Sequence, residues 1–515
     1  MEREKSVSLK REISKDAKTA LLICGDWRHG VRLTQWSIDE DVEAHVVPNL
    51  CKRPEEISEL LTDKGIGRLV LGLCPGEYSM AEVQTQARKV GLDALGVEIV
   101  HLKGMRLEKA KILLAAAVAR ARAYAGSEPE NAKPSLPTRM SRRELFKIPL
   151  LEYRAVPSIQ ESLCFVDLGC RTCVQLCPCG ALERADGNLQ HDKMKCESCS
   201  LCVTACPRDA IINPAITTEQ LEAQVRALLD FTTGNIKPRG IIFTCQHAPE
   251  QEGSRHDSWM PVKLPCVGMA LPSWFLAPLL MGASAVCALP CQKGCAIGQA
   301  QLIAGRVAYC QEFLRLIGAP KDLVRFSRSP GPMPPEEGKR VSLEYPFNYK
   351  TTANVLMRIA QEYDADQVVL EHHNSPLGIV EVRADVCSGC GMCARVCPTG
   401  ALLYDTGKEG VFLTFDATTC VACGQCLLKC PEAEREAIRL YRKTDLTRIS
   451  RGRKIIYQGK APKCVACGSP IAPSKMIRRI EELLGNEYAA TADILTRYCP
   501  ACRGVAAFHG SRIRA

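Results

Sequence analysis

The 515-residue sequence contains no complete GxGxxG motif after an expected strand. Its nearest approach, Gly65-Ile-Gly67-Arg-Leu-Val70, lacks the third glycine and precedes an expected strand. A phosphate-binding loop, a nucleophile elbow and an HExxH sequence are absent as well. A flavin or nicotinamide domain is therefore not expected in this chain.

The sequence also lacks an uninterrupted apolar run that could span a membrane. The longest uncharged stretch, residues 264–292, contains four prolines, so it predicts a buried helix followed by a buried strand. Residues 1–18 are charged and have no apolar core, so a secretory signal is not expected and disulfides are disfavoured. We expect a cytoplasmic protein with no transmembrane segment of its own, which could associate with a membrane through its partners.

Aromatic residues make up only 5% of the chain, whereas cysteine is in large excess, with 30 residues. The formal net charge of +10 would suggest a nucleic-acid partner if every cysteine were neutral. Metal-bound cysteines are thiolates, and the metal sites inferred below would bring the net charge to about −2. We therefore expect metal sites and no nucleic-acid partner.

Many of the cysteines belong to an internal repeat with the spacing CxxCxxCxxxCP. Three copies are complete and begin at Cys196, Cys387 and Cys420. Three cysteines two residues apart in a tight turn can bind three irons of one 4Fe-4S cluster, and the fourth cysteine reaches a neighbouring cluster. This spacing indicates iron–sulfur clusters far more strongly than zinc sites or free thiols.

A fourth copy, Cys170-Arg-Thr-Cys173-Val-Gln-Leu-Cys177-Pro178, is irregular. Asp167 stands where its first cysteine is expected, and the nearest candidate is Cys164. A three-residue insertion in the loop could still bring Cys164 to the iron. Cys179 and Asp167 are reserve ligands.

The four copies resemble bacterial two-cluster ferredoxins. The crossed connectivity of that family implies four 4Fe-4S clusters in two ferredoxin-like domains. The implied ligand sets are Cys164, Cys170, Cys173 and Cys206; Cys196, Cys199, Cys202 and Cys177; Cys387, Cys390, Cys393 and Cys430; and Cys420, Cys423, Cys426 and Cys397.

Residues 1–126 alternate short apolar runs with helical patterns, which predicts a small parallel α/β domain. Cys24, Cys51 and Cys74 each follow an expected strand, so parallel strands would bring the three thiols to one sheet edge. The motifs around these cysteines resemble the N-terminal domain of heterodisulfide reductase A, which implies a fifth 4Fe-4S cluster. That family has further cysteines that this chain lacks, so Asp26 or His29 would be the fourth ligand. The alternative is three buried cysteines without a cluster.

Residues 236–328 show the same pattern, in which a cysteine directly follows an expected strand. Ile241-Ile242-Phe243-Thr244-Cys245 and Val262-Lys263-Leu264-Pro265-Cys266 are two such units, and Cys291 and Cys295 follow a third apolar run. The segment resembles the delta subunit of methyl-viologen-reducing hydrogenase, which implies a 2Fe-2S cluster. Cys245, Cys266, Cys291 and Cys295 make a complete ligand set, although the family usually has a second cysteine soon after the first. In the alternatives, His247 replaces one cysteine or no cluster forms.

Two CxxC pairs near the C-terminal end, Cys464 with Cys467 and Cys499 with Cys502, suit a tetrahedral zinc ion. Their separation exceeds that of an ordinary ribbon, and an expected helix at residues 477–484 can fill the gap. Rubredoxin-like iron is the alternative, because that family has similar knuckles with a comparable separation. We predict a zinc-ribbon-like module with structural zinc.

The expected fold class is therefore multidomain α/β and α+β. It comprises two small parallel α/β domains, two ferredoxin-like domains with two 4Fe-4S clusters each and a zinc-ribbon-like module. The expected boundaries are 1–126 (heterodisulfide reductase A-like), 127–157 (linker), 158–235 (first ferredoxin domain with a following helix), 236–328 (delta subunit-like), 329–379 (linker and helix/strand connector), 380–445 (second ferredoxin domain) and 446–515 (zinc-ribbon-like or rubredoxin-like module).

These features predict an electron-transfer subunit of a larger redox complex, not itself catalytic, that conducts single electrons between partner subunits. The partner classes left open are heterodisulfide reductase-like, hydrogenase, formate dehydrogenase and quinone-linked modules. In one alternative the chain is a thiol or disulfide reductase that uses an incompletely ligated N-terminal cluster. In another it is a scaffold for cluster assembly, which the complete ferredoxin motifs disfavour because they hold clusters firmly.

Overall fold

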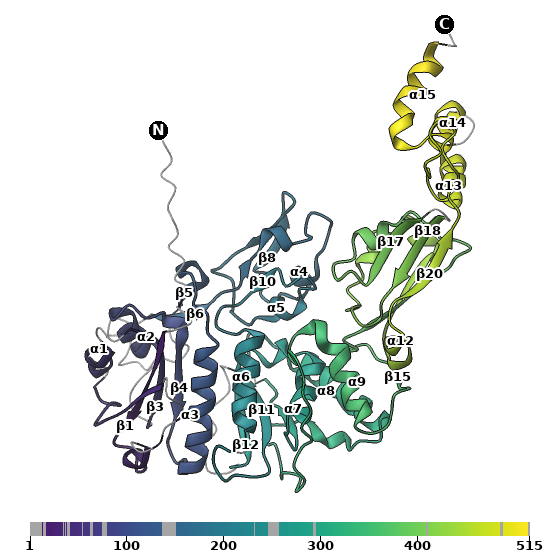
Figure 1. The fold of residues 1–515 in the computed structure, drawn as a ribbon. Coiled ribbons are helices and arrows are strands. Elements are labelled where there is room, and N and C mark those ends of the chain that lie inside the picture. The colour runs from purple at the N-terminus through teal and green to yellow at the C-terminus, as the bar shows by residue number, and fades with distance from the viewer. Residues whose placement is uncertain are drawn as a thin grey trace, which may run out of the picture. The chain divides into compact units, whose positions relative to one another are not determined.

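The computed structural model forms two compact units, unit 1 (residues 1–164 and 171–351) and unit 2 (residues 165–170 and 352–515). Figure 1 shows the elements of each. The structure describes residues 13, 17–33, 36, 38, 42–53, 55–61, 65–74, 80–135, 151–230, 232–245, 257–291, 295–407, 410–484 and 488–512. Within these ranges, every helix is too short or too polar to cross a lipid bilayer.

Unit 1 begins with a four-stranded parallel sheet in the order β2-β1-β3-β4. Its elements are β1 (Lys18–Cys24), β2 (Val42–Val47), α1 (Glu55–Leu61), β3 (Ile66–Leu73), α2 (Met80–Lys89), β4 (Val97–His101) and α3 (Leu107–Arg122). Strand β1 lies in the middle of the sheet and is buried from Thr19 to Cys24. Its continuous apolar sequence suits a parallel strand that is covered on both faces, so the expected parallel α/β pattern is confirmed.

A second parallel sheet in unit 1 has the corresponding strand order, β12-β11-β13-β14. Its elements are β11 (Gly240–Cys245), β12 (Trp259–Leu264), α7 (Pro272–Leu280), β13 (Val286–Ala288), α8 (Ala300–Leu316) and β14 (Val324–Phe326). Helix α7 is buried at every residue, and so is strand β13. The prediction of a buried helix and a buried strand between residues 264 and 292 is confirmed.

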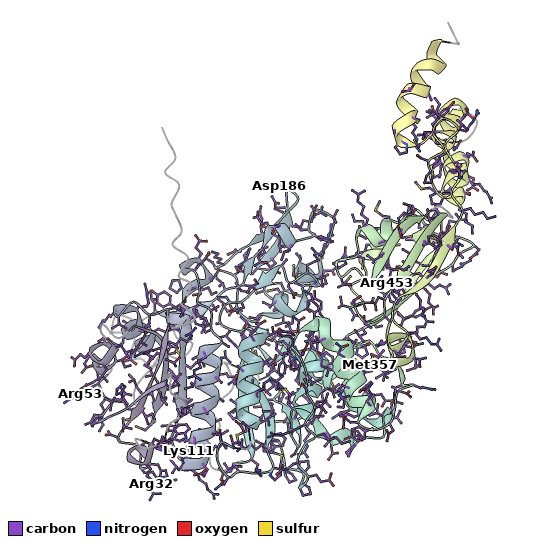
Figure 2. All side chains as sticks on the ribbon, viewed as in Figure 1. Arg32, Arg53, Lys111, Asp186, Met357 and Arg453 are labelled. Atoms are coloured by element: carbon purple, nitrogen blue, oxygen red, sulfur yellow. The ribbon has the colours of Figure 1, made fainter. Side chains whose placement is uncertain are left out.

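The first ferredoxin-type module, residues 158–212, has two antiparallel strand pairs. Strand β7 (Ser158–Ile159) pairs with β10 (Ile211–Ile212), and between them lies the hairpin of β8 (Leu182–Ala185) and β9 (Asn188–His191). Asp186 and Gly187 both have positive φ at the hairpin tip, where Figure 2 labels Asp186. An Asp-Gly pair favours this tight turn. Two short helices follow the cysteine loops, α4 (Thr172–Leu176) and α5 (Leu201–Ala205).

Helix α6 (Thr218–Leu229) follows this module and packs along α3 within unit 1. A capping box formed by Thr217 and Gln220 begins the helix. Arg120 of α3 donates to the Gln224 side chain at 3.1 Å and forms an ion pair with Glu98 at 2.8 Å. Unit 1 also contains the antiparallel pair β5 (Ala132–Ser135) and β6 (Glu152–Ala155).

Unit 2 contains the second ferredoxin-type module, residues 378–445, with the same plan. Strand β16 (Gly378–Val382) pairs with β19 (Ile438–Asp445), and between them lies the hairpin of β17 (Leu402–Gly407) and β18 (Gly410–Phe415). The remaining elements are α9 (Thr352–Gln361), β15 (Val369–Glu371), α10 (Met392–Arg395), α11 (Gln425–Leu428), α12 (Leu446–Ser450) and β20 (Lys454–Gly459). Strand β20 extends the hairpin, and Arg453 before it donates to Ala401 O at 3.0 Å.

The C-terminal part of unit 2 is helical. It contains α13 (Ser474–Leu484), α14 (Ala489–Arg497) and α15 (Pro500–Arg512), which confirms the helix expected at 477–484. The structure does not confirm a zinc ribbon, because past β20 the described residues contribute only the isolated bridge between Lys463 and Pro470. The sequence between the two CxxC pairs is long enough for two helices, which here replace the strands of a ribbon.

Candidate metal centres

The three complete cysteine motifs have the same backbone conformation. In each loop the residue before the second cysteine and the residue after it have positive φ. These pairs are Ser198 and Ser200, Gly389 and Gly391, and Ala422 and Gly424. Such a conformation turns the chain tightly and points backbone amides inward, which suits a group rich in negative charge. The irregular copy keeps the first feature at Gly169 (φ 91°) but not the second, because Arg171 has φ −134°.

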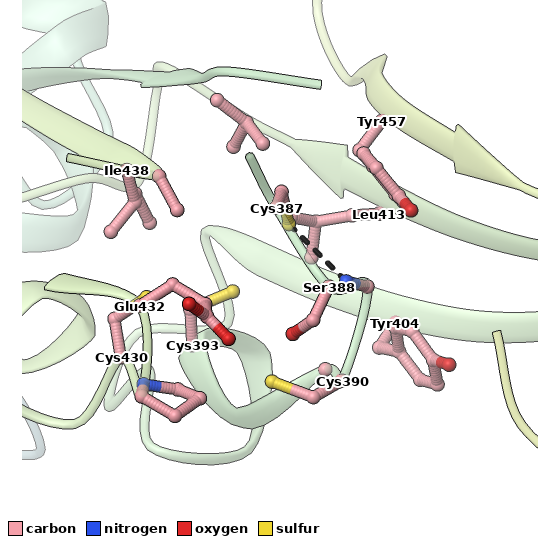
Figure 3. Close-up of a pocket in the computed structure, with 15 residues that line it drawn as sticks. Cys387, Ser388, Cys390, Cys393, Tyr404, Leu413, Cys430, Glu432, Ile438 and Tyr457 are labelled. Carbon is pink, nitrogen blue, oxygen red and sulfur yellow. Dashed lines mark hydrogen bonds between the residues drawn. The ribbon is translucent and has the colours of Figure 1, made fainter. Parts of the chain in front are cut away.

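In the second module, one predicted ligand set lines a single pocket. Cys387, Cys390, Cys393 and Cys430 surround it, and Figure 3 shows them as sticks. Most of the other lining side chains are apolar or aromatic, among them Val382, Tyr404, Leu413, Ile438 and Tyr457, and the buried carboxylate of Glu432 also lines the pocket. Four soft thiolate donors around a largely apolar space fit a 4Fe-4S cluster.

Burial and backbone hydrogen bonds act on these thiols in opposite directions. Burial raises the pKa of Cys393 to about 12, so its thiolate needs a positive partner, which iron would supply. The Gly389 amide donates to the Cys387 sulfur at 3.4 Å, which stabilises the thiolate (Figure 3). The Leu402 amide donates likewise to Cys397 at 3.5 Å, within the other set of this module.

That other set, Cys397, Cys420, Cys423 and Cys426, is also brought together. Burial raises the pKa of Cys426, and the charges of Cys420, Cys423 and Cys397 add to the rise. Burial likewise raises the pKa of Cys420 to about 12 and that of Cys423 to about 11. The four thiols are therefore neighbours in the fold.

In the first module, Cys177, Cys196, Cys199 and Cys202 gather in the same way. The Ser198 amide donates to Cys196 at 3.4 Å, and the Ala181 amide donates to Cys177 at 3.3 Å. Burial raises the pKa of Cys199 to about 12, with smaller contributions from Cys196, Cys179 and Cys177. A fifth thiol, Cys179, therefore lies beside this set.

The structure brings together three of the four residues predicted for the irregular set. Cys173 and Cys206 are buried in one apolar cluster, and Cys164 packs against it. Cys170 belongs to unit 2, where its charge contributes to raising the pKa of Cys423, behind burial and Cys397. Asp167, a reserve ligand, is exposed. The membership of Cys170 in this set stays a prediction.

The cysteines of the second parallel sheet lie at the carboxyl ends of their strands. Cys245 ends β11, Cys266 follows β12 and Cys291 follows β13. Burial raises the pKa of Cys266 to about 12, and the charges of Cys199, Cys291 and Cys245 add to it, so these thiols are neighbours. Burial raises the pKa of Cys291, and the charge of Cys295 adds to the rise, so Cys295 is a neighbour of Cys291. His247, the alternative ligand, lies outside the described residues.

The N-terminal sheet brings Cys24, Cys51 and Cys74 together, as its parallel strands require. Their sulfur atoms all lie within 4.8 Å of one another, with Cys51 and Cys74 2.9 Å apart and Cys24 and Cys74 3.1 Å apart. Asp26 is engaged elsewhere, because it forms an ion pair with Lys52 at 3.2 Å. His29 packs edge-on against Trp27, and burial lowers its pKa. A neutral imidazole is the form that binds metals.

The four C-terminal cysteines Cys464, Cys467, Cys499 and Cys502 also meet, with sulfur atoms within 4.8 Å of one another. A hydrogen bond from the Cys499 amide is the largest cause that lowers the pKa of Cys464 to about 6. Four thiols at this spacing fit a single tetrahedral ion such as zinc or iron.

One contact was not predicted from the sequence. Buried Cys199 and Cys266 share an apolar cluster with Leu201 and Ile297, and Cys295 packs against it. The cluster joins the first ferredoxin-type module to the second parallel sheet. No sequence signal predicts that Cys199 and Cys266 share a cluster, because the two cysteines are far apart in the chain and belong to different motifs.

Two protein-family models match the chain. A model described as a 4Fe-4S dicluster domain matches residues 386–434, and one described as a 4Fe-4S binding domain matches residues 189–212. The search of curated proteins finds no match. The matches fall on the two modules whose loops and thiols fit iron–sulfur clusters. The chain therefore carries two ferredoxin-type 4Fe-4S domains and is an iron–sulfur electron-transfer protein.

Proposed function

We propose that this chain is an electron-transfer subunit of a larger redox complex and conducts single electrons between partner subunits. When bound, each cluster accepts or releases one electron at a time. The chain's own residues hold the clusters in fixed positions, bury them from water and tune their potentials through amide hydrogen bonds to sulfur. Substrate chemistry within the chain is not required for this function.

The observation that carries this proposal is the adjacency of ligand sets. In each module the two short helices that carry the third cysteines contact each other, α4 with α5 for Cys173 and Cys202, and α10 with α11 for Cys393 and Cys426. In unit 1, Cys199 then shares an apolar cluster with Cys266. Such neighbouring sets support a continuous path for electrons within unit 1.

The proposal includes four 4Fe-4S clusters at the ferredoxin-type ligand sets and a 2Fe-2S cluster at Cys245, Cys266, Cys291 and Cys295. It also includes zinc at Cys464, Cys467, Cys499 and Cys502, with iron as the alternative. The resemblances to heterodisulfide reductase A and to the hydrogenase delta subunit, together with the domain boundaries given above, belong to the same proposal. We propose that the complex is cytoplasmic. The two resemblances favour a heterodisulfide reductase-like or hydrogenase partner, and formate dehydrogenase and quinone-linked partners stay open.

Redox titration and turnover of the anaerobically purified chain test this function. A low-potential donor should reduce the chain, because ferredoxin-type clusters commonly have potentials near about −400 mV, and an artificial acceptor should reoxidise it. The isolated chain should neither oxidise NADH nor reduce a disulfide. Cys291→Ser should remove a 2Fe-2S signal and leave the 4Fe-4S signals unchanged. Turnover of NADH or a disulfide by the isolated chain, at about 1–1000 per second, would contradict the proposal.

The N-terminal three-thiol site favours a second candidate function, reduction of a thiol or disulfide substrate. Cys24, Cys51 and Cys74 offer three ligands, and among the described residues no fourth thiol joins their group. An iron bound there could keep an open position for substrate sulfur. In that case Cys51→Ser should abolish disulfide turnover while the ferredoxin-type signals persist. Absence of turnover in the unaltered chain, with this site loaded, would rule the candidate out.

A further inference from the structure

Cys179 lies beside Cys177, one of the four cysteines predicted to hold a cluster. Its sulfur is 3.7 Å from the Cys177 sulfur, and both residues pack against the apolar cluster of buried Val156, Ala181 and Cys196. Cys179 therefore lies beside the predicted fourth ligand Cys177, against the same apolar cluster.

The Cys179 sulfur also has hydrogen-bond donors of the kind that cluster ligands receive. These donors are the backbone amides of Glu197 and Ala181. The Ala181 amide also donates to the Cys177 sulfur at 3.3 Å. One backbone donor thus serves two sulfur atoms that lie side by side.

The second module provides the natural comparison. Thr399 occupies the position that corresponds to Cys179, two residues after the last cysteine of its motif, and its hydroxyl lies 3.8 Å from the Cys397 sulfur. The two other motifs have Arg208 and Glu432 at this position. The additional thiol is thus a feature of the irregular copy alone.

We infer that Cys179 is an exchangeable ligand of the cluster held by Cys196, Cys199 and Cys202, and that it trades places with Cys177. The inference rests on the cluster assignment proposed above. In the exchange, the Cys179 thiol loses its proton and forms an iron–sulfur bond. The bond from Cys177 to the same iron breaks, and the Cys177 thiolate takes the proton. No electron is transferred, and the total charge of the site is unchanged.

Iron and sulfide content of anaerobically purified full-length variants tests this inference. Cys177→Ser and Cys179→Thr should each keep the iron content of the unaltered chain, because the remaining thiol completes the set. The double variant should lose about four irons. Cys397→Ser in the second module, where threonine stands beside the ligand, should lose about four irons by itself. Loss of four irons from Cys177→Ser alone would overturn the inference.

Two further variants separate failure of this inference from failure of the cluster assignment. Cys199→Ser should lose about four irons; unchanged iron there would refute the assignment and with it the exchange. Cys310→Ala, at a buried cysteine that belongs to none of the predicted ligand sets, controls for general destabilisation and should keep all iron.

Thiol alkylation of the loaded, unaltered chain gives an independent readout. Mass spectrometry should find the label on Cys177 in some molecules and on Cys179 in others, and never on both in one molecule. Label on one residue alone would show a fixed ligand and overturn the exchange. Labelling of both in one molecule would overturn it as well.

Discussion

The two ferredoxin-type modules share a plan but differ in the regularity of their cysteines. Each pairs an early strand with a late one around a hairpin, and the hairpins match in register. Leu182 lies opposite His191 in the first module, as Leu402 lies opposite Phe415 in the second. The main-chain frame is thus repeated even where the ligands are not.

The difference is concentrated in the loop before α4. Asp167 replaces a cysteine, Arg171 lacks the positive φ of its counterparts, and an additional thiol follows at Cys179. The family models reflect this difference, because the second module is matched across both motifs and the first only at residues 189–212.

The largest expected effect concerns metal content. If both modules hold two 4Fe-4S clusters, the anaerobically purified chain should contain about 18 irons including the 2Fe-2S cluster, or about 22 with the N-terminal site loaded, and about one zinc. Replacing Cys393 and Cys423 by serine together should remove about eight irons, and so should replacing Cys173 and Cys199. Elemental analysis measures the iron and zinc content of the unaltered chain and of the two double variants. Iron near eight in the unaltered chain would show that the irregular module holds no pair of clusters.

A second prediction compares the residue that begins the helix after the ligand loop. Leu201 is fully buried beside Cys199, whereas its counterpart Met392 is half-buried. Leu201→Ala should reduce the free energy of unfolding by about 2–5 kcal/mol, because it leaves a cavity. Met392→Ala should reduce the free energy of unfolding by clearly less. Denaturant unfolding under anaerobic conditions measures both, and equal costs would contradict the burial difference.

A third prediction concerns the tight turn at Gly389. Ser198 and Ala422 adopt positive φ at the same position, so the backbone alone does not demand glycine there. A Cβ on Gly389 would lie 2.8 Å from the buried Tyr457 ring, whereas one on Gly424 would meet nothing within 4 Å. Gly389→Ala should therefore destabilise by about 1–3 kcal/mol more than Gly424→Ala. Similar melting temperatures for the two variants would refute this.

Much of the arrangement could be predicted from the sequence, because its signals are local. The CxxCxxCxxxCP spacing marks the loops, and apolar runs that end in a cysteine mark parallel strands, as at Cys24 and Cys245. The contact between Cys199 and Cys266 could not be predicted, since it depends on how separate elements pack. The helices after Cys467 were only partly predicted, because paired knuckles specify how a metal is held but not the chain between them.

The smallest expected effect uses the matched hairpin positions His191 and Phe415. Burial, and then the charge of Lys193, lower the pKa of His191 below its ordinary 6.5, so the unfolded state binds a proton more readily than the folded state. The stability that His191 contributes is therefore complete above pH 6.5 and is lost as the pH falls through its lower folded value. Hydrogen exchange, corrected for intrinsic rates, should show weaker protection of β8 and β9 at pH 5 than at pH 7. His191→Phe, which copies the second module, should remove the difference, and a difference that persists would assign the pH dependence to another group.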